Sequence, residues 1–139
     1  GMENNTPPLR IFVVEDSSIV RERLVAVLHE LAGVYVVGEA ENANAAVAGI
    51  LRTQPHLVLL DVHLVDGTGM DVVRAIHPRL PDIVFVVLTN YSELIYRHAY
   101  LKAGAAFYLD KSHEFQNVPR IVMDLQQQNA LSKSQGDPQ

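Results

Sequence analysis

Short apolar runs alternate along the chain with longer stretches of helical spacing. The runs are rich in Val, Ile, Leu and Phe, as buried strands are. Between and after them, apolar residues recur every three or four positions, which predicts amphipathic helices with one face on a core. The predicted strands are LRIFVV (9–14), VYVVGEA (34–40), LVLL (57–60), IVFVVL (83–88) and FYL (107–109).

Residues that begin and end helices agree with this pattern. Ser17 or Ser18 can cap the first helix, and Gly104 closes the fourth. Because a crossover helix returns the chain to the same edge of a sheet, strand–helix alternation implies parallel strands. The predicted fold class is α/β, a doubly wound five-stranded parallel sheet built from five βα units.

Length and composition narrow the possible functions. The 139 residues fit one domain, and a formal net charge of -5 offers no basic stripe for nucleic acid. The chain has no cysteine, no apolar run long enough to span a bilayer, and no signal-peptide pattern. We therefore expect a cytoplasmic protein that binds neither nucleic acid nor membrane by itself.

The domain is expected to span residues 9–128. Residues 1–8 form a polar lead that is expected to be disordered, and its Gly1-Met2 pair resembles a cleavage scar. Residues 129–139 are expected to form a C-terminal tail, which lacks periodicity and apolar content from Ser132 onward.

Polar side chains follow four of the five predicted strands. Glu15 and Asp16 follow the first strand, Asp61 the third, Thr89 the fourth and Lys111 the fifth. The carboxyl ends of parallel strands gather at the edge where ligands bind, so we expect these side chains to converge on one crevice.

Three carboxylates in one crevice repel one another unless a cation lies among them, and oxygen ligands of this kind suit Mg²⁺. With such an ion, Lys111 and the Thr89 hydroxyl could neutralise the oxygens of a phosphoryl group during transfer. Asp61 is then placed to be the nucleophile that forms an aspartyl phosphate.

These positions resemble a family, the response-regulator receiver domains of two-component signalling, over roughly residues 9 to 128. The resemblance implies a CheY-like, flavodoxin-like fold with strand order 2-1-3-4-5. It rests on Glu15-Asp16, Asp61 with Gly69 eight residues later, Thr89, and Lys111 with Tyr108 three residues before it.

The resemblance also implies a role for each residue of the metal site. Asp16, Asp61 and the backbone carbonyl of His63 would hold Mg²⁺, and Glu15 would act through water. The family more often has Asp-Asp than the Glu15-Asp16 pair found here. The change lengthens one arm and keeps its charge, so metal binding is expected to survive.

For the reaction, the resemblance implies that Asp61 accepts phosphate from a histidine kinase, a phosphotransfer protein or a small-molecule phosphodonor. Thr89 and Lys111 would bind the phosphoryl group, and Tyr108 would rotate together with Thr89. Such a domain is a switch and not an enzyme. It would signal by changing its contacts with a downstream protein, with a kinase, or with a second copy in a homodimer.

Some positions depart from the family pattern. Ser112 follows Lys111 where the family usually has a proline joined by a cis bond, and a non-proline cis bond costs about 2.5–4 kcal/mol. The geometry of the Lys111–Ser112 bond is therefore left open. Val65 replaces the usual proline four residues after Asp61, and Asn90 stands where a small residue is common.

Two pairs of side chains lead to further hypotheses. His63 and Tyr91 each lie two residues after a predicted site residue, in positions that flank the path of the hydrolytic water in this family. We expect them to slow dephosphorylation. Tyr96 and Tyr100 lie one helical turn apart, either as half-buried aromatics or as a partner surface.

Two other functions compete with the switch. One is a Mg²⁺-dependent phosphatase or phosphotransferase that uses the Asp61 nucleophile, but enzymes of the haloacid-dehalogenase type typically carry a second aspartate two residues later, where this chain has His63. The other is a binding module that is never phosphorylated, which the intact Asp61, Thr89 and Lys111 disfavour.

Overall fold

The computed structural model describes residues 7–91 and 93–135, with the side chains of the last helix described as far as Asn129. Its five strands form one sheet in the order β2-β1-β3-β4-β5, and every neighbouring pair is parallel. The predicted fold class and strand order are confirmed. The strands are β1 Leu9–Val14, β2 Val34–Ala40, β3 Leu57–Leu60, β4 Val84–Thr89 and β5 Phe107–Asp110.

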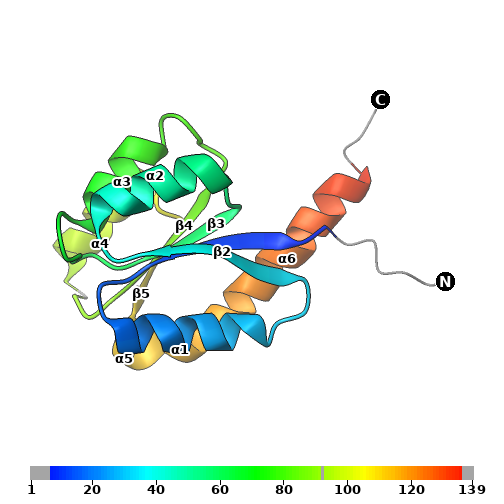
Figure 1. Ribbon diagram of the computed structural model, residues 1–139, viewed down its shortest axis with the longest axis horizontal. Helices are drawn as coiled ribbons and strands as arrows, with labels where there is room; N and C mark the ends of the chain where they lie inside the picture. Colours follow the sequence, from blue (N-terminus) through cyan, green and yellow to red (C-terminus); the bar gives the residue numbers. More distant parts are fainter. Residues whose placement is uncertain (1–6, 92, 136–139) are drawn as a thin grey trace.

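Helices cover both faces of the sheet, with α2 and α3 on one side and α1 and α6 on the other (Figure 1). None of the helices in the described ranges combines the length and the apolar character that crossing a membrane requires. The helices are α1 Ser18–His29, α2 Ala43–Thr53, α3 Gly69–Ile76, α4 Leu94–Ala103, α5 Lys111–Glu114 and α6 Val118–Gln135, with a 3₁₀ turn at Phe115–Asn117.

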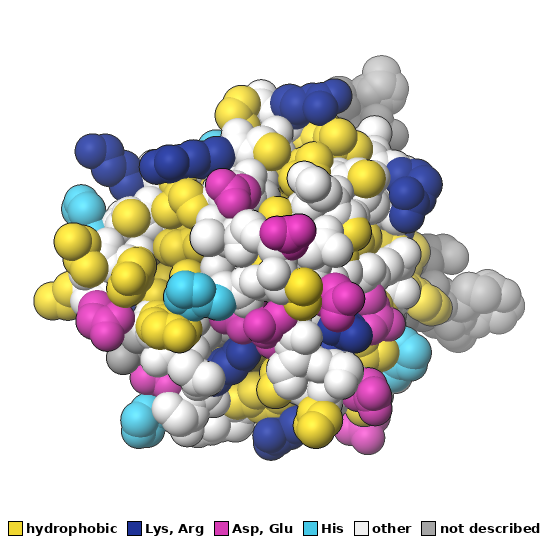
Figure 2. Space-filling model, turned by 60° about the vertical axis from the view of Figure 1, so that its left-hand side comes forward, with side chains coloured by type: hydrophobic (Ala, Val, Ile, Leu, Met, Phe, Trp, Pro, Cys, Tyr) yellow, Lys and Arg dark blue, Asp and Glu magenta, His cyan; other side chains and the backbone are white. Residues whose placement is uncertain are grey.

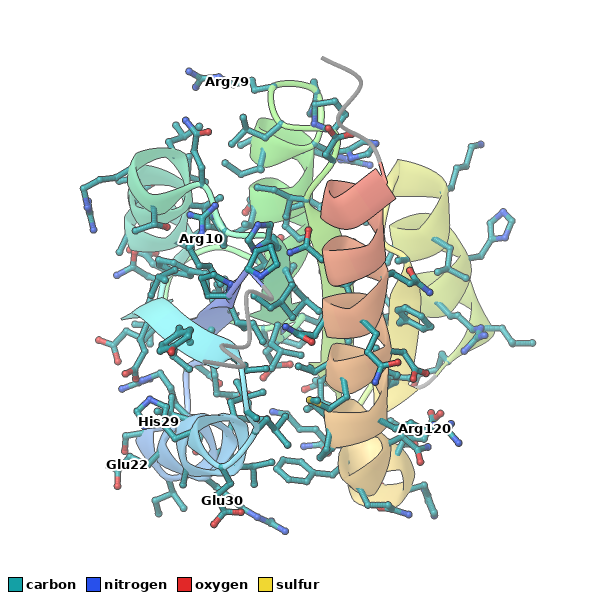
Figure 3. All side chains as sticks on the ribbon, turned by 90° about the vertical axis from the view of Figure 1, so that its right-hand side faces the viewer. Arg10, Glu22, His29, Glu30, Arg79 and Arg120 are labelled. Atoms are coloured by element: carbon teal, nitrogen blue, oxygen red, sulfur yellow. The ribbon has the colours of Figure 1, made fainter. Side chains whose placement is uncertain are left out.

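Successive strand residues feed two separate cores, because neighbouring side chains on a strand point to opposite faces. In β1, Phe12 and Val14 join the core under α2 and α3, whereas Ile11 and Val13 join the core under α1 and α6. This explains the continuous apolar runs in the sequence. Polar side chains of α1, such as the labelled Glu22, lie on the side away from the sheet (Figure 3).

Side chains at the helix ends fix where the helices begin. Ser17, one of the two predicted caps, accepts a hydrogen bond from the Val20 amide at 3.3 Å. Thr68 and Asp71 form a reciprocal capping box at the start of α3. Gly104 ends α4 with a φ of 122°, a conformation that favours glycine.

The last helix extends further than the sequence predicted. Residues 129–135, expected to be a tail, continue α6, because the segment contains no helix breaker before Gly136. At the other end, the Pro7 carbonyl accepts a hydrogen bond from Gln126 Nε2 at 3.3 Å. Residues 1–6 and 136–139, which belong to the expected lead and tail, lie outside the described residues.

Candidate functional site

The parallel sheet brings the predicted site residues to one edge. Val14 is paired with Leu60 at the ends of β1 and β3, and the Asp61 amide donates to the Val14 carbonyl at 3.0 Å. On the other side, Thr89 is in register with Asp110, so Lys111 follows β5 at the same level. Figure 2 shows acidic side chains near the centre of one face of the molecule, with basic ones among them.

Asp61 lies at this edge of the sheet and is 7% exposed. Its Oδ1 accepts a hydrogen bond from the Val62 amide at 2.7 Å, and its Oδ2 accepts one from Lys111 Nζ at 2.9 Å. Each carboxylate oxygen therefore has a donor, which offsets part of the cost of burying a charge.

Glu15 shares the same ammonium group. It is 1% exposed, and its Oε1 lies 2.8 Å from Lys111 Nζ. Its Oε2 accepts a hydrogen bond from the Ser17 amide at 3.0 Å. Burial raises the pKa of Glu15 to about 7 although Lys111 and the Ser17 amide act to lower it.

Lys111 bridges the two carboxylates. Burial by itself would lower the pKa of its ammonium, but the hydrogen bonds to Glu15 and Asp61 outweigh burial and the pKa is raised. The crevice thus holds a fixed positive charge between two carboxylates.

The third acid, Asp16, completes a group that fits a metal ion. Glu15, Asp16 and Asp61 each offer a carboxylate oxygen, and these oxygens lie within 4.8 Å of one another. Asp16 is exposed and the other two are buried, so one side of the group is open to water. Hard oxygen donors with an open side suit Mg²⁺.

Thr89 is fully buried next to the crevice, and its Oγ1 accepts a hydrogen bond from the Tyr91 amide at 3.2 Å. The Tyr108 hydroxyl donates to the carbonyl of the same Tyr91. Burial raises the pKa of Tyr108 to about 12. Both predicted switch residues therefore hold the Tyr91 backbone, a link that no spacing in the sequence could reveal.

His63 and Tyr91, predicted from their positions alone, are in contact. Their ring centroids lie 4.3 Å apart, and both side chains are exposed beside the crevice. Tyr96 continues the contact, because its ring centroid lies 6.4 Å from that of Tyr91. The effect of His63 and Tyr91 on dephosphorylation stays a prediction.

The placement of the tyrosine pair on α4 needs correction. Tyr96 is 43% exposed, but Tyr100 is only 2% exposed and its ring lies 5.7 Å from that of Tyr108. Leu94 and Ile95 are instead 79% and 76% exposed. The most exposed apolar side chains of α4 are therefore Leu94 and Ile95, which lie on the face opposite to Tyr96 and Tyr100.

The described residues contain no cis peptide bond, so the Lys111–Ser112 bond in the loop after β5 is trans. Asp110 caps α5, and its Oδ1 accepts hydrogen bonds from the Ser112 amide at 2.8 Å and the Ser112 hydroxyl at 2.6 Å. Glu114 accepts from the Asp110 amide at 2.9 Å. These bonds fix the segment that carries Lys111.

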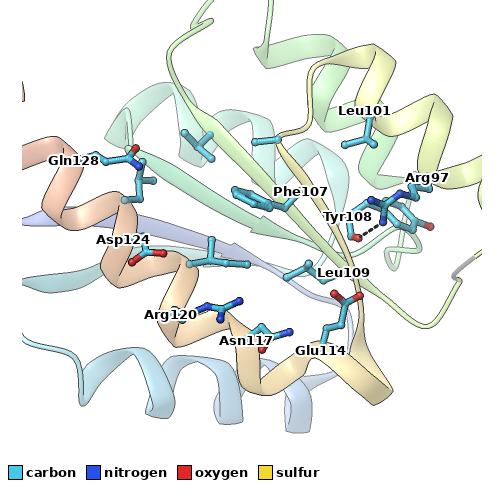
Figure 4. Close-up of a pocket in the computed structure, with 14 residues that line it drawn as sticks. Arg97, Leu101, Phe107, Tyr108, Leu109, Glu114, Asn117, Arg120, Asp124 and Gln128 are labelled. Carbon is cyan, nitrogen blue, oxygen red and sulfur yellow. Dashed lines mark hydrogen bonds between the residues drawn. The ribbon is translucent and has the colours of Figure 1, made fainter.

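A groove of about 630 Å³ lies along β5 between α4 and α6, with Glu114 and Asp124 on its lining (Figure 4). At its end, Arg97 Nη1 donates to the Tyr108 carbonyl at 3.1 Å. This bond ties α4 to the edge strand of the sheet.

The comparisons with known proteins agree with this fold. Residues 11–123 match the model of the response regulator receiver domain. The chain belongs to this family.

In alignments with two curated relatives, about a third of the aligned residues are identical. It is 32% identical to the DNA-binding transcriptional activator DevR/DosR of Mycobacterium tuberculosis over 84% of this chain and 54% of that protein. It is 33% identical to the response regulator GacA of Pseudomonas protegens over 74% of this chain and 48% of that protein. The chain thus spans about half the length of these relatives.

Solved structures have the same fold. The signal receiver domain of the putative response regulator NarL from Mycobacterium tuberculosis matches with a TM-score of 0.80 at 26% identity, over 87% of this chain and 98% of that one. The response regulator domain of Thermotoga maritima CheB matches with a TM-score of 0.76 at 20% identity, over 88% and 96%.

Proposed function

We propose that Asp61 is the phosphoacceptor of this receiver domain, and that its phosphorylation switches the protein between two states. The observation that carries the proposal is the 2.9 Å contact between Asp61 Oδ2 and Lys111 Nζ in an acidic crevice. A buried carboxylate with a fixed ammonium beside it is a nucleophile whose product finds a positive charge already in place.

The reaction is a transfer from a phosphorylated histidine or an acyl phosphate. An Asp61 oxygen attacks phosphorus as the bond from phosphorus to the donor nitrogen or oxygen breaks, and the leaving group keeps the electron pair. Lys111 balances charge on the phosphoryl oxygens, and the Thr89 hydroxyl donates a hydrogen bond to one of them. Hydrolysis of the acyl phosphate by water restores the carboxylate.

Mg²⁺ is the cofactor that the acid group suits. Glu15, Asp16 and Asp61 would hold it, with the His63 backbone carbonyl as a further ligand. When bound, the ion supplies positive charge that offsets the repulsion between the carboxylates and the incoming phosphate.

The switch depends on Thr89. When its hydroxyl turns to a phosphoryl oxygen, its bond with the Tyr91 amide is weakened, and the Tyr108 hydroxyl, bound to the Tyr91 carbonyl, is free to rotate. Phosphorylation can shift an equilibrium only through such differences in contact between two states.

Partners of the switch are a phosphodonor and a receiver of the signal. A histidine kinase, a phosphotransfer protein or a small acyl phosphate supplies the phosphoryl group, in the cytoplasm. The exposed Leu94 and Ile95 on α4 give a surface for a downstream protein or for a second copy of the chain. Turnover of an external substrate is not part of the proposed function.

The test is the intact mass of the protein after incubation with acetyl phosphate and Mg²⁺, for wild type and Asp61→Asn. One added phosphoryl group in wild type alone is the expected result. Labelling of Asp61→Asn would reject Asp61 as the acceptor. Turnover of a chromogenic phosphate ester would favour the rival enzyme, and lack of labelling at every sampling time would favour a binding module.

A further inference from the structure

Arg21 lies near the beginning of α1, at a position where the helical pattern predicts an apolar residue. It stands three residues before Leu24 and seven before Leu28, the buried side chains of this helix, so it shares the helix face that packs against the sheet. A cation this close to the beginning of a helix is also unfavourable, because the N-terminus carries partial positive charge. Two local rules are broken at one residue, which indicates that its contacts outweigh them.

The guanidinium of Arg21 makes contacts at the ends of two strands. Its Nη1 donates to the Glu15 carbonyl at 2.6 Å, directly after β1. Its Nε lies 3.4 Å from Glu39 Oε1, near the end of β2. The Arg21 side chain is 19% exposed, so most of it is shielded from water, and a hydrogen bond from a charged donor is stronger than one between neutral groups.

Strand pairing places Glu39 on the same side of the sheet as Arg21. Glu39 is in register with Val13, which joins the core under α1 and α6. Because paired residues of neighbouring strands point to the same face, the Glu39 side chain extends towards α1. Strand β2 therefore supplies a partner for Arg21, although the three carboxylates of the acid group follow β1 and β3.

The Glu15 carbonyl belongs to the peptide group that leads into Asp16. A peptide group is planar, so a contact that fixes the carbonyl oxygen also fixes the direction of the Asp16 amide. On its other side, the Glu15 amide donates to the Ala40 carbonyl at 3.0 Å. Residues 15–17 belong to no helix or strand, so these bonds set the direction in which the two acidic side chains leave the main chain.

We propose that Arg21 is a positioning residue for the metal site, which holds the peptide group between Glu15 and Asp16 so that both carboxylates stay in the acid group. Glu39 in turn holds the guanidinium. The effect on metal binding rests on the proposed Mg²⁺ site, whereas the hold on the peptide group does not.

The charge of Arg21 and its positioning role act in opposite directions on metal affinity. A nearby cation repels Mg²⁺, so removal of the charge alone should leave the affinity unchanged or raise it. Loss of a residue that orients metal ligands instead lowers the affinity, typically by about 10–100-fold. The direction of the change therefore separates positioning from a purely electrostatic effect.

Calorimetric titration of chelator-treated protein with Mg²⁺ measures the dissociation constant for wild type, Arg21→Gln and Arg21→Lys. The matched control is Arg79→Gln, which removes the same charge at an exposed position before β4, at the opposite edge of the sheet (Figure 3). Asp16→Asn shows whether the bound ion occupies the acid group. Urea unfolding shows that each variant is folded under the conditions of the titration.

In Arg21→Gln we expect the dissociation constant to rise about tenfold, the lower end of the range, because Arg21 acts through the main chain. Arg21→Lys keeps the charge and should lie between this variant and wild type, since one ammonium nitrogen replaces the two guanidinium nitrogens that hold Glu15 and Glu39. Arg79→Gln should match wild type. An affinity equal to wild type or tighter in Arg21→Gln would overturn the proposal.

A second measurement does not need the metal. Amide nitrogen relaxation by NMR gives the order parameter of the Asp16 amide in metal-free protein, which should fall from about 0.85 in wild type to below about 0.6 in Arg21→Gln. The Leu59 amide in β3 should keep its wild-type value.

If Mg²⁺ binds equally well to Asp16→Asn and wild type, the proposed metal site fails. The order parameter of the Asp16 amide then still decides whether Arg21 holds the peptide group. An unchanged value in Arg21→Gln would show that it does not.

Discussion

At the scale of single residues, the buried carboxylates of the candidate site have few hydrogen-bond donors. Lys111 Nζ serves both Glu15 and Asp61, at 2.8 Å and 2.9 Å. The remaining oxygens are satisfied by backbone amides. One ammonium between two buried carboxylates leaves an excess of negative charge, and this excess makes the protonation of Glu15 sensitive to pH.

The stability of the metal-free protein should fall as pH rises because of Glu15. Its pKa is about 7 in the folded protein against an ordinary value of 4.5 for glutamate. Between these values the folded state holds more protons, so the stabilisation is complete below pH 4.5 and is lost as pH rises through 7. At about 1.4 kcal/mol per pKa unit, the free energy of unfolding should fall by about 2–3 kcal/mol relative to Glu15→Gln.

Urea unfolding of wild type and Glu15→Gln with a chelator present, from pH 4.5 to pH 8, measures this difference. Effects of pH on groups other than Glu15 are common to both proteins and cancel in the comparison. A constant difference across the range would show that Glu15 keeps an ordinary pKa in the folded protein.

The aromatic pair beside the crevice should set the lifetime of the phosphorylated state. The His63 and Tyr91 rings are in contact, with centroids 4.3 Å apart, and each residue lies two positions after a residue of the proposed site. In the double variant His63→Ala, Tyr91→Ala we expect several-fold faster loss of the phosphoryl group, because water reaches it more easily. A time course of intact mass after removal of acetyl phosphate measures the rate.

Tyr35→Ala is the control for this pair, since Tyr35 is an exposed aromatic on the distant edge strand β2. Its rate should equal that of wild type. An unchanged lifetime in the double variant would mean that the two rings do not limit access of water.

At the scale of the elements, the sequence predicted those parts of the fold that repeat a regular pattern. The apolar strands and the helices with apolar residues every three or four positions all form, and the polar residues at the strand ends converge because parallel strands end together. The sequence left open whether Tyr96 and Tyr100 are buried, because apolar residues of α4 do not fall on one face, and the structure buries Tyr100 alone. Hydrogen bonds to the Tyr91 backbone depend on tertiary packing and left no local signal in the sequence.

At Gly49, the close packing of α2 on the sheet should outweigh the higher helix propensity of alanine, so that Gly49→Ala is destabilising. Alanine favours a helix over glycine by about 1 kcal/mol. A Cβ at Gly49, however, would lie 2.6 Å from the Phe12 ring, which is itself fully buried. Overpacking typically costs about 1–3 kcal/mol, so Gly49→Ala should lower the free energy of unfolding in urea.

Ala48→Gly, at the neighbouring exposed position of α2, is the matched control. It should also be destabilising, by about 1 kcal/mol, through propensity alone. A stabilised Gly49→Ala protein would show that Phe12 moves aside at little cost.

At the scale of the whole molecule, all the side chains of the candidate site lie at one end of the sheet. The loops after β1, β3, β4 and β5 all lie at the carboxyl edge of the sheet (Figure 1). Helix α6 runs to Gln135, and the chain spans about half the length of the relatives described above. Under the proposed function, a change at Asp61 reaches the exposed apolar surface of α4 through the contacts of Thr89 and Tyr108 with Tyr91.

Binding of Mg²⁺ at the acid group should stabilise the entire domain, because the three carboxylates are brought together only in the folded state. At ten times the dissociation constant, binding adds about 1.4 kcal/mol to the free energy of unfolding. For a domain of this size the melting temperature should rise by roughly 4–6 °C. Asp16→Asn should lose most of this rise, while Asp82→Asn, at an exposed acid elsewhere, should keep it. Thermal unfolding with and without Mg²⁺ measures the effect, and equal shifts in the two variants would place the ion outside the crevice.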